Sequence, residues 1–292
     1  NNMNILVTGG AGFIGTNLIK ALLKKGYSVT SIDNYSTGLK SNHVEGCNYI
    51  TGDITTITDY SQYGEFNMVY HLAALARIQP SFKTPVKTFE TNANGTILIA
   101  EYCVKNNIPL FYAGSSSHHS GKFKNPYTYS KEIGEEIIQL YQQHYGLKAS
   151  IARFYNVYGP SHLKEGAYCT VIGKWETALE NEQPLTIYGD GTKRRDFTHV
   201  DDIVNALILI YQKQAWGYTF ELGRGINYSI QEIADMFNNV INPYGVVYEE
   251  NKPGEALTTL CTDTLAKEIL GWEPILNIED YVKNWLINNG WL

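Results

Sequence analysis

The chain has 292 residues, of which 43% are hydrophobic and 18% charged, and its formal net charge is −6 at pH 7. This composition is typical of a folded globular protein, and an acidic balance without any run of lysine or arginine argues against a nucleic-acid-binding surface. No apolar run approaches the roughly 20 residues of a membrane span. The four scattered cysteines indicate neither a metal site nor a disulfide framework, so we expect a cytoplasmic protein that binds no metal and no membrane.

The N-terminal stretch carries the strongest local signal. Residues 5–7 form a short apolar run typical of a buried strand, and an amphipathic stretch at 13–25 predicts a helix. Gly9, Gly12 and Gly15 lie in the turn and at the helix start. The first can adopt a positive φ, the second lets the backbone approach a phosphate, and the third lets the helix pack closely on the strand. This unit predicts a dinucleotide pyrophosphate at the helix N-terminus.

A second apolar run, residues 27–32, ends at Asp33, which lies 18 residues after Gly15. An acid at this point accepts hydrogen bonds from the adenosine ribose hydroxyls of a dinucleotide. It also repels the 2′-phosphate of NADP, and the first arginine in the chain is as distant as Arg77. We therefore expect NAD, and not NADP, as the cofactor.

Apolar and amphipathic segments continue to alternate through the first half of the chain. Further strands are expected at 48–51, 67–71, 109–113 and 148–155, and further helices at 85–106 and 127–145. Alternation with short connections predicts an α/β fold with a doubly wound, mainly parallel sheet of the NAD-binding Rossmann type. Such sheets bind ligands at the carboxyl ends of their strands. His71, at the end of one strand and followed by apolar residues, is interpreted as structural.

The second half of the chain differs in character from the first. Beyond Gly159 and Pro160, prolines and glycines are more frequent and the elements are shorter. We expect residues 1–160 to form the dinucleotide-binding domain and 161–292 a smaller C-terminal lobe that binds the substrate. A regular helix and strand suggest that 200–223 returns to the first domain.

Tyr127 and Lys131 are four residues apart at the start of a predicted helix, so their side chains share one face. An ammonium beside a phenol favours the phenolate, which can act as a general base toward a sugar hydroxyl. A second Tyr-x-x-x-Lys pair, Tyr248 and Lys252, precedes a proline that prevents a continuing helix. Ser117, after the neighbouring strand, is placed to hydrogen-bond the same hydroxyl.

Together the motifs resemble those of one family. They are Thr8-Gly9-Gly10-Ala11-Gly12-Phe13-Ile14-Gly15, Asp33-Asn34, His71-Leu72-Ala73-Ala74, Pro126-Tyr127-Thr128-Tyr129-Ser130-Lys131 and Arg195-Asp196-Phe197-Thr198-His199-Val200-x-Asp202. The chain resembles the extended short-chain dehydrogenase/reductase family, and within it the NAD-dependent nucleotide-sugar epimerases and dehydratases, most of all UDP-glucose 4-epimerases. The resemblance implies that NAD takes hydride from C4 of a nucleotide-diphosphate hexose, leaving a transient 4-keto sugar that receives the hydride on its other face.

The resemblance also implies roles for individual residues. Tyr127 is the base, Lys131 lowers its pKa and holds the nicotinamide ribose, and Ser117 is the hydroxyl partner. The implied cofactor-binding residues are Gly9, Gly12, Phe13, Ile14, Gly15, Asp33, Asn34, Asp53, Ile54, Leu72, Ala73, Ala74, Asn92, Tyr127, Lys131 and Tyr155. The implied substrate-binding residues are Ser117, Tyr127, Asn156, Tyr188, Arg195 and Lys252.

Three departures from the family pattern bear on the reaction and the sugar. Lys252-Pro253-Gly254-Glu255 replaces an Arg-Pro-Gly-Asp/Glu motif, which keeps the charge but loses the bidentate fork of arginine. Dehydratases carry Thr-Asp-Glu where this chain has Ser117-His118-His119. A 4,6-dehydratase or decarboxylase therefore stays the alternative, a catalytically inactive NAD-binding regulatory protein is a further one, and a role for the two histidines in the chemistry stays open. The segment between Ser117 and Tyr127 is also unusually short.

Two expectations concern the substrate pocket and the assembly. In UDP-galactose 4-epimerases, a tyrosine between the Arg-Pro-Gly-Asp motif and the next aspartate excludes N-acetyl groups. This chain has Thr258, Thr259 and Leu260 in that interval, so we expect UDP-N-acetylhexosamines to be accepted beside UDP-hexoses. The resemblance further implies a homodimer built on the helices 85–106 and 127–145.

Overall fold

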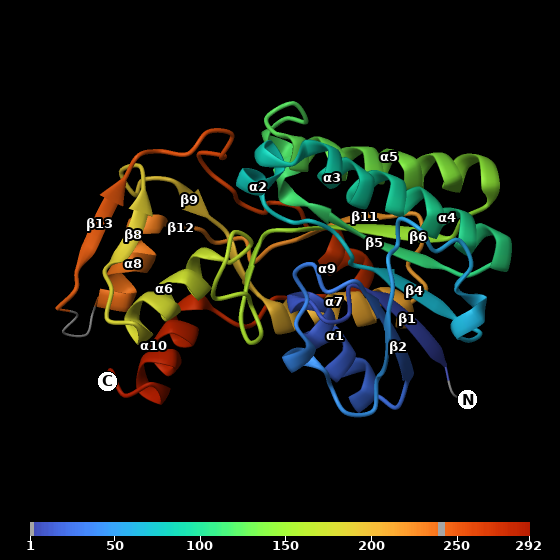
Figure 1. Cartoon of the computed structure of the whole chain (residues 1–292), viewed down its shortest axis with the longest axis horizontal. Coiled ribbons are helices and arrows are strands. Elements are labelled where there is room, and N and C mark those ends of the chain that lie inside the picture. Colours follow the sequence, from blue (N-terminus) through green and yellow to red (C-terminus); the bar gives the residue numbers. More distant parts are fainter. Residues whose placement is uncertain (1–2, 239–242) are drawn as a thin grey trace.

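The computed structural model describes residues 3–238 and 243–292, and at its centre lies one seven-stranded sheet (Figure 1). All neighbouring strands in it are parallel, in the order β11-β6-β5-β4-β1-β2-β3. The strands are β1 (Asn4–Thr8), β2 (Ser28–Asp33), β3 (Asn48–Thr51), β4 (Met68–His71), β5 (Leu110–Ser115), β6 (Ala149–Phe154) and β11 (Thr219–Leu222). The strand order reverses at β1, which pairs with β2 on one side and β4 on the other, so a ligand crevice is expected there. The predicted doubly wound parallel sheet is confirmed.

Helices cover both faces of this sheet (Figure 1). On one face, α1 (Phe13–Lys24), α7 (Val200–Gln212) and α9 (Leu265–Leu270) bury leucines and isoleucines against the strands. On the other face lie α2 (Ile78–Lys83), α3 (Pro85–Phe89), α4 (Gly95–Asn106) and α5 (Pro126–Tyr145). The central strands β1, β4 and β5 are therefore buried on both faces, which explains why their sequences are continuous apolar runs instead of alternating ones.

The helix predicted at 85–106 is divided in the structure. A π-helical turn, Glu90–Asn94, separates α3 from α4 and carries Asn92. The Asn92 amide donates to Leu75 O at 3.1 Å and to Ser130 Oγ at 2.9 Å, and it accepts from Leu75 N at 2.9 Å. A buried amide is unfavourable unless it is hydrogen-bonded, and the π turn aligns it with these partners. Sequence periodicity alone does not show such a turn.

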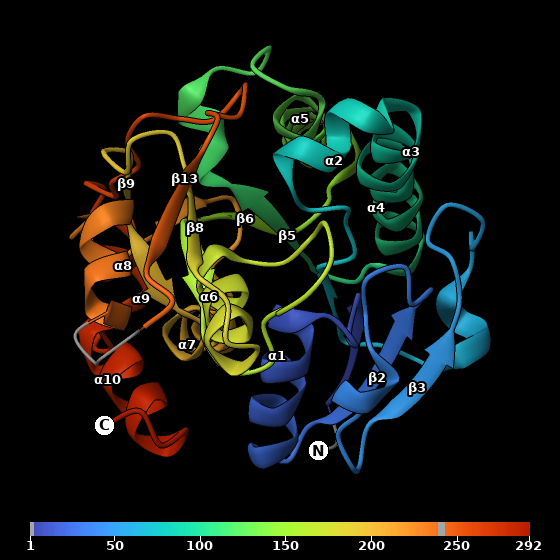
Figure 2. The ribbon, with the colours of Figure 1, turned by 60° about the vertical axis from the view of Figure 1, so that its left-hand side comes forward.

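A second apolar core lies beside the sheet, in the C-terminal part of the chain (Figure 2). Large side chains such as Trp175, Leu185 and Phe237 meet in it. Its elements are α6 (Val171–Glu180), β8 (Leu185–Tyr188), α8 (Ile230–Asn238), β13 (Val246–Glu249) and α10 (Ile278–Asn288). Strand β8 pairs with β13 in parallel, although the two are distant in sequence.

The remaining elements are short. The strands β7 (Asn156–Tyr158), β9 (Arg194–Arg195), β10 (Phe197–His199) and β12 (Tyr228–Ser229) form two small two-stranded sheets. The 3₁₀ turns η1 (Lys40–Asn42), η2 (Tyr60–Tyr63) and η4 (Ser116–Ser120) lie in loops of the part that holds the large sheet. The strand predicted at 148–155 ends at Phe154, and β7 then leaves the main sheet to pair with β10. Among the described helices, none combines the length and hydropathy that crossing a bilayer requires.

Candidate active site

The turn after β1 has the geometry of a phosphate cradle. Gly9 has a φ of +73°, and a Cβ at this position would lie 2.8 Å from the backbone nitrogen of Ala73. A Cβ on Gly15 would collide with the carbonyl oxygen of Gly9. Gly12 is the N-cap of α1 and has no side chain to cap the helix, so the first N–H groups of α1 face the crevice. These residues fit the pyrophosphate of a dinucleotide at the helix N-terminus.

Asp33 closes the adenosine end of the same crevice. Its Oδ2 accepts from the Ala11 N–H at 3.0 Å and its Oδ1 from the Tyr35 N–H at 2.8 Å. These bonds fix the carboxylate at the carboxyl end of β2, where it lines the pocket beside Asn34. Its orientation fits the acceptance of ribose hydroxyls and opposes a 2′-phosphate.

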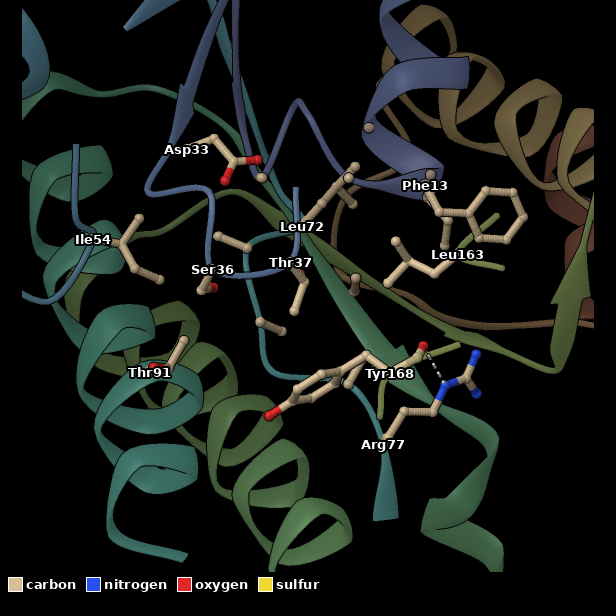
Figure 3. Close-up of a pocket in the computed structure, with 18 of the residues that line it drawn as sticks. Phe13, Asp33, Ser36, Thr37, Ile54, Leu72, Arg77, Thr91, Leu163 and Tyr168 are labelled. Carbon is tan, nitrogen blue, oxygen red and sulfur yellow. Dashed lines mark hydrogen bonds between the residues drawn. The ribbon is translucent and has the colours of Figure 1, made fainter. Parts of the chain in front are cut away.

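One continuous pocket joins the glycine turn to the predicted base (Figure 3). The predicted residues that line it are Gly9, Gly12, Phe13, Ile14, Gly15, Asp33, Asn34, Ile54, Leu72, Ala73, Ala74, Tyr127 and Lys131. Three predicted cofactor residues lie outside it: Asp53, Asn92 and Tyr155. Asp53 holds its own turn, because its Oδ1 accepts from both the N–H and the hydroxyl of Thr55, at 2.8 and 2.7 Å. Asn92 has the three bonds described above, and Tyr155 is 6% exposed and packed in the core.

The candidate base lies where α5 begins. Asn125 is the N-cap of α5 and Pro126 its first residue, which places Tyr127 in the first turn, facing β5. Burial raises the pKa of the Tyr127 phenol, whereas a hydrogen bond with the Ser115 side chain and the positive charge of Arg77 lower it. Lys131 is 8% exposed, and its Nζ donates to the Ala113 carbonyl at 2.8 Å. Burial lowers the pKa of Lys131 to about 8, and Glu135 acts in the opposite direction.

Two serines lie near the phenol of Tyr127. A side-chain hydrogen bond with Ser115, at the end of β5, lowers the pKa of that phenol. The hydroxyl of Ser117 donates to Ser115 Oγ at 2.9 Å and is thus linked to Tyr127 through Ser115. Both serines line the pocket in front of Tyr127, but sequence spacing could not distinguish them because the 3₁₀ turn Ser116–Ser120 starts within the serine cluster.

His118 and His119, whose role the sequence left open, point away from this pocket. His118 Nδ1 lies 2.5 Å from Glu132 Oε2 on α5, and His119 Nε2 lies 2.5 Å from Glu221 Oε1 on β11. Arg153 on β6 bonds Glu221 as well, because its Nη1 donates to Glu221 at 3.0 Å and its Nε to Glu135 at 2.8 Å, and Glu135 lies 3.6 Å from His118 Nδ1. The histidines therefore anchor the serine segment to the sheet and to α5.

A second pocket adjoins the first at Tyr127 and Arg77, which line both. Ser115, Ser116, Ser117, Arg195, Glu255 and Thr259 also line it. Thr259 is thereby the one of the three candidate gate residues that faces the pocket. Its hydroxyl donates to Asn156 Oδ1 at 2.9 Å, so Asn156 lies behind Thr259 and not at the pocket wall.

Two other predicted substrate residues lie elsewhere. Tyr188 and Lys252 do not line this pocket; the ammonium of Lys252 lies 3.9 Å from the centre of the Tyr188 ring. Lys174 donates to the Tyr188 hydroxyl at 3.0 Å and thereby lowers the pKa of that phenol. Three polar groups from α6, β8 and the 252–255 segment thus form their own cluster.

The sequence also missed residues that line the first pocket. Leu163, Tyr168 and Thr170 come from the irregular segment before α6, and Figure 3 shows Leu163 and Tyr168 beside Phe13 and Arg77. Arg77 also lines this pocket, and no motif in the sequence marks it as a site residue. The segment carries no motif, so only the pairing of distant parts of the chain brings these side chains to the pocket.

His71 has the structural role predicted for it. It is 3% exposed, and its ring nitrogens lie 2.7 Å from the hydroxyl of Thr8 and 3.0 Å from that of Thr96. Burial is the main cause that lowers its pKa to about 3, so the ring is neutral and holds β1, β4 and α4 together.

A glycine-turn pocket that ends at a half-buried tyrosine and a buried lysine is typical of a dinucleotide-dependent enzyme. The model of the NAD dependent epimerase/dehydratase family matches residues 5–223. The chain belongs to this family, and NAD is its cofactor.

Relatives of different activity are similar to this chain. A putative UDP-glucose 4-epimerase of Methanocaldococcus jannaschii is 30% identical, over 98% of this chain and 99% of the relative. A UDP-N-acetyl-alpha-D-glucosaminuronate decarboxylase of Bacillus cytotoxicus is 31% identical, over 78% and 77%. Among solved structures, the UDP-glucose 4-epimerase of Thermotoga maritima with UDP-glucose has a TM-score of 0.90 and 28% identity, over 98% of this chain and 99% of that one. These comparisons place the chain in an enzyme family that includes epimerases and decarboxylases.

Proposed function

We propose that this enzyme inverts C4 of a nucleotide-diphosphate hexose, and that its pocket accepts UDP-hexoses and UDP-N-acetylhexosamines. The observation that carries the proposal is the position of Tyr127, which lines both the cofactor pocket and the adjoining pocket. A single phenol can thus reach a substrate hydroxyl whose carbon faces the cofactor. The UDP-sugar relatives support the nucleotide sugar as the occupant of the second pocket.

Each residue around the phenol has a defined task in this reaction. Tyr127 takes the proton from the C4 hydroxyl and returns it, and Ser115 holds the phenol and the reacting oxygen by hydrogen bonds. Arg77 is the positive charge that lowers the pKa of the Tyr127 phenol, and Lys131 adds an ammonium on the same face of α5. The hydride acceptor and donor for C4 would be supplied by bound NAD. Inversion then requires the 4-keto sugar to turn in the pocket, which Arg195 permits if it holds the distant diphosphate and leaves the sugar free.

The absence of a second acid–base pair favours epimerisation over loss of water. Dehydration of a 4-keto sugar needs an acid for the leaving hydroxyl and a base for the C5 proton. Among the described residues that line the second pocket, Glu255 is the single carboxylate, and it accepts from Gln79 Nε2 at 3.2 Å. His118 and His119 are bound to glutamates outside the pocket.

A redox-inactive regulatory protein has no physical need for this site. A buried ammonium four residues from a phenol is energetically costly, since burial disfavours the charge of Lys131. Such a cost is expected where the charge assists a reaction.

The test is product analysis with purified enzyme. UDP-glucose, UDP-N-acetylglucosamine and UDP-glucuronate are each incubated with the protein, and the products are resolved by NMR. C4 epimers without any net change in composition support the proposal. A 4-keto-6-deoxy sugar would show a dehydratase, and a UDP-pentose with released CO₂ a decarboxylase.

A further inference from the structure

Arg77 is a cation beside the candidate base, and among the described residues no carboxylate forms an ion pair with it. It is the N-cap of α2 and lines both pockets. Its Nε donates to the Tyr168 carbonyl at 3.2 Å, as the dashed line in Figure 3 shows. Within the part of the chain that the structure describes, Arg77 forms no ion pair, and Nη1 and Nη2 donate to no protein group.

The surroundings of Arg77 make an unpaired charge unfavourable. Burial lowers the pKa of the guanidinium, and the negative groups that act against this effect are Tyr127, Cys169 and Glu255. Glu255 also acts on Arg195, so one carboxylate faces two arginines without pairing with either. A partly buried guanidinium is expected to have an anionic partner, and we expect a ligand to supply it here.

The position of Arg77 restricts which ligand anion this is. The cofactor pyrophosphate belongs at the glycine turn, near Asp33 and Phe13, and Figure 3 shows Asp33 well apart from Arg77. The substrate diphosphate belongs near Arg195 in the proposed reaction. Arg77, in contrast, is close enough to Tyr127 to lower the pKa of its phenol, and Tyr127 works at C4 of the sugar. C6 is separated from C4 by one ring carbon, so a cation beside the C4 base can reach a carboxylate at C6.

We propose that Arg77 binds a carboxylate at C6, so that the preferred substrate is a nucleotide-linked hexuronic acid. The inference rests on the proposed C4 chemistry, because the placement of the sugar follows from it. The Tyr168 carbonyl fixes Nε, which leaves Nη1 and Nη2 to form the two parallel bonds that a carboxylate accepts. The segment that carries Tyr168 therefore contributes to selectivity without contacting the sugar.

The experiment compares UDP-glucuronate with UDP-glucose on the NAD-loaded enzyme and on the variants R77Q and R77K. For the parent, we expect kcat/KM and the equilibrium dissociation constant both to favour the uronate. In R77Q the ratio of the two kcat/KM values should fall by about a hundredfold, the size expected when a site built for a polar group loses its partner. For R77K the ratio should lie between those of the parent and R77Q, since an ammonium keeps the positive charge but lacks the paired N–H donors of a guanidinium.

The control is R195Q, which removes the other arginine of the pocket. R195Q should weaken the binding of both nucleotide sugars to the same degree, because both carry the diphosphate. The inference is overturned if R77Q lowers the activity on both sugars equally, which would mean that Arg77 serves Tyr127 or the cofactor, or if the parent prefers UDP-glucose. Epimerisation of UDP-glucose but not of the uronate leaves the proposed function intact and refutes the inference. If the enzyme releases CO₂ from the uronate and R77Q still lowers the kcat/KM ratio as expected, the proposed function is refuted and the inference is supported.

Discussion

The buried ion cluster formed by Arg153, Glu135 and Glu221 provides a direct test of the energetics. Arg153 is 13% exposed in its side chain and bonds Glu135 and Glu221, which are 3% and 7% exposed. Replacing Arg153 with methionine keeps much of the side-chain volume and removes the charge. The variant leaves two carboxylates buried without their common partner, and breaking such a pair costs about 3–5 kcal/mol. For a chain of this size about 2 °C is lost per kcal/mol, so we expect the Tm to fall by about 6–10 °C at neutral pH.

The pH dependence of this loss identifies its cause. Burial raises the pKa of Glu135 above 4.5, and the hydrogen bond and charge of Arg153 oppose that shift. Without Arg153 the folded-state pKa of Glu135 rises further. A raised folded-state pKa means that the folded protein holds the proton more tightly than the unfolded chain. The penalty is therefore absent below the unfolded-state pKa and grows as the pH rises through the folded-state pKa, so R153M should lose more stability at pH 8 than at pH 5.

The assay is thermal unfolding of parent and variants at pH 5 and pH 8. K267M is the matched control, because Lys267 pairs with Glu273 at 2.9 Å while their side chains are 67% and 61% exposed. An ion pair on the surface contributes little, and K267M should leave the Tm unchanged at both pH values. A fall of less than about 3 °C for R153M, or an equal fall at both pH values, would refute the electrostatic reasoning.

Four further outcomes are expected. Y127F should lower kcat by about 10²- to 10⁴-fold while the protein still binds NAD by calorimetry, because the phenol transfers protons and the ring only packs; near-parental turnover would indicate another base. NAD should bind more tightly than NADP to the parent, and D33S should bring the two dissociation constants closer together, because Asp33 repels the 2′-phosphate. Tighter binding of NADP by the parent contradicts this. Sedimentation should show a homodimer at micromolar concentration that L140E dissociates, because Leu140 on α5 is 50% exposed; a monomeric parent refutes it. T259Y should lower kcat/KM for UDP-N-acetylglucosamine more than for UDP-glucose, because a tyrosine at this wall overlaps the acetyl group; equal losses would place the gate elsewhere.

The sequence predicted the sheet well because its signals are local. A strand buried on both faces appears as an apolar run, and the glycine turn and Asp33 mark strand ends by residue type alone. The predicted run at 48–51 coincides with β3, and the predicted starts of α1 and α7 are those of the structure. The π turn at Glu90–Asn94 escaped prediction because it depends on what Asn92 meets across the fold.

Some site residues are also related by local sequence, whereas others meet only in the folded structure. Only the residues of the first kind could be predicted. Tyr127 and Lys131 lie on one helix, so their spacing alone predicts a shared face. Ser115 and Arg77 act on Tyr127 from the ends of β5 and of the loop after β4, and neither has a fixed spacing to it. Parallel strands that are not adjacent in sequence deliver their carboxyl ends to the same edge, so contacts made there depend on strand order, which no local pattern encodes. The base could therefore be predicted from the sequence, but the groups that set its pKa and its selectivity depend on the topology.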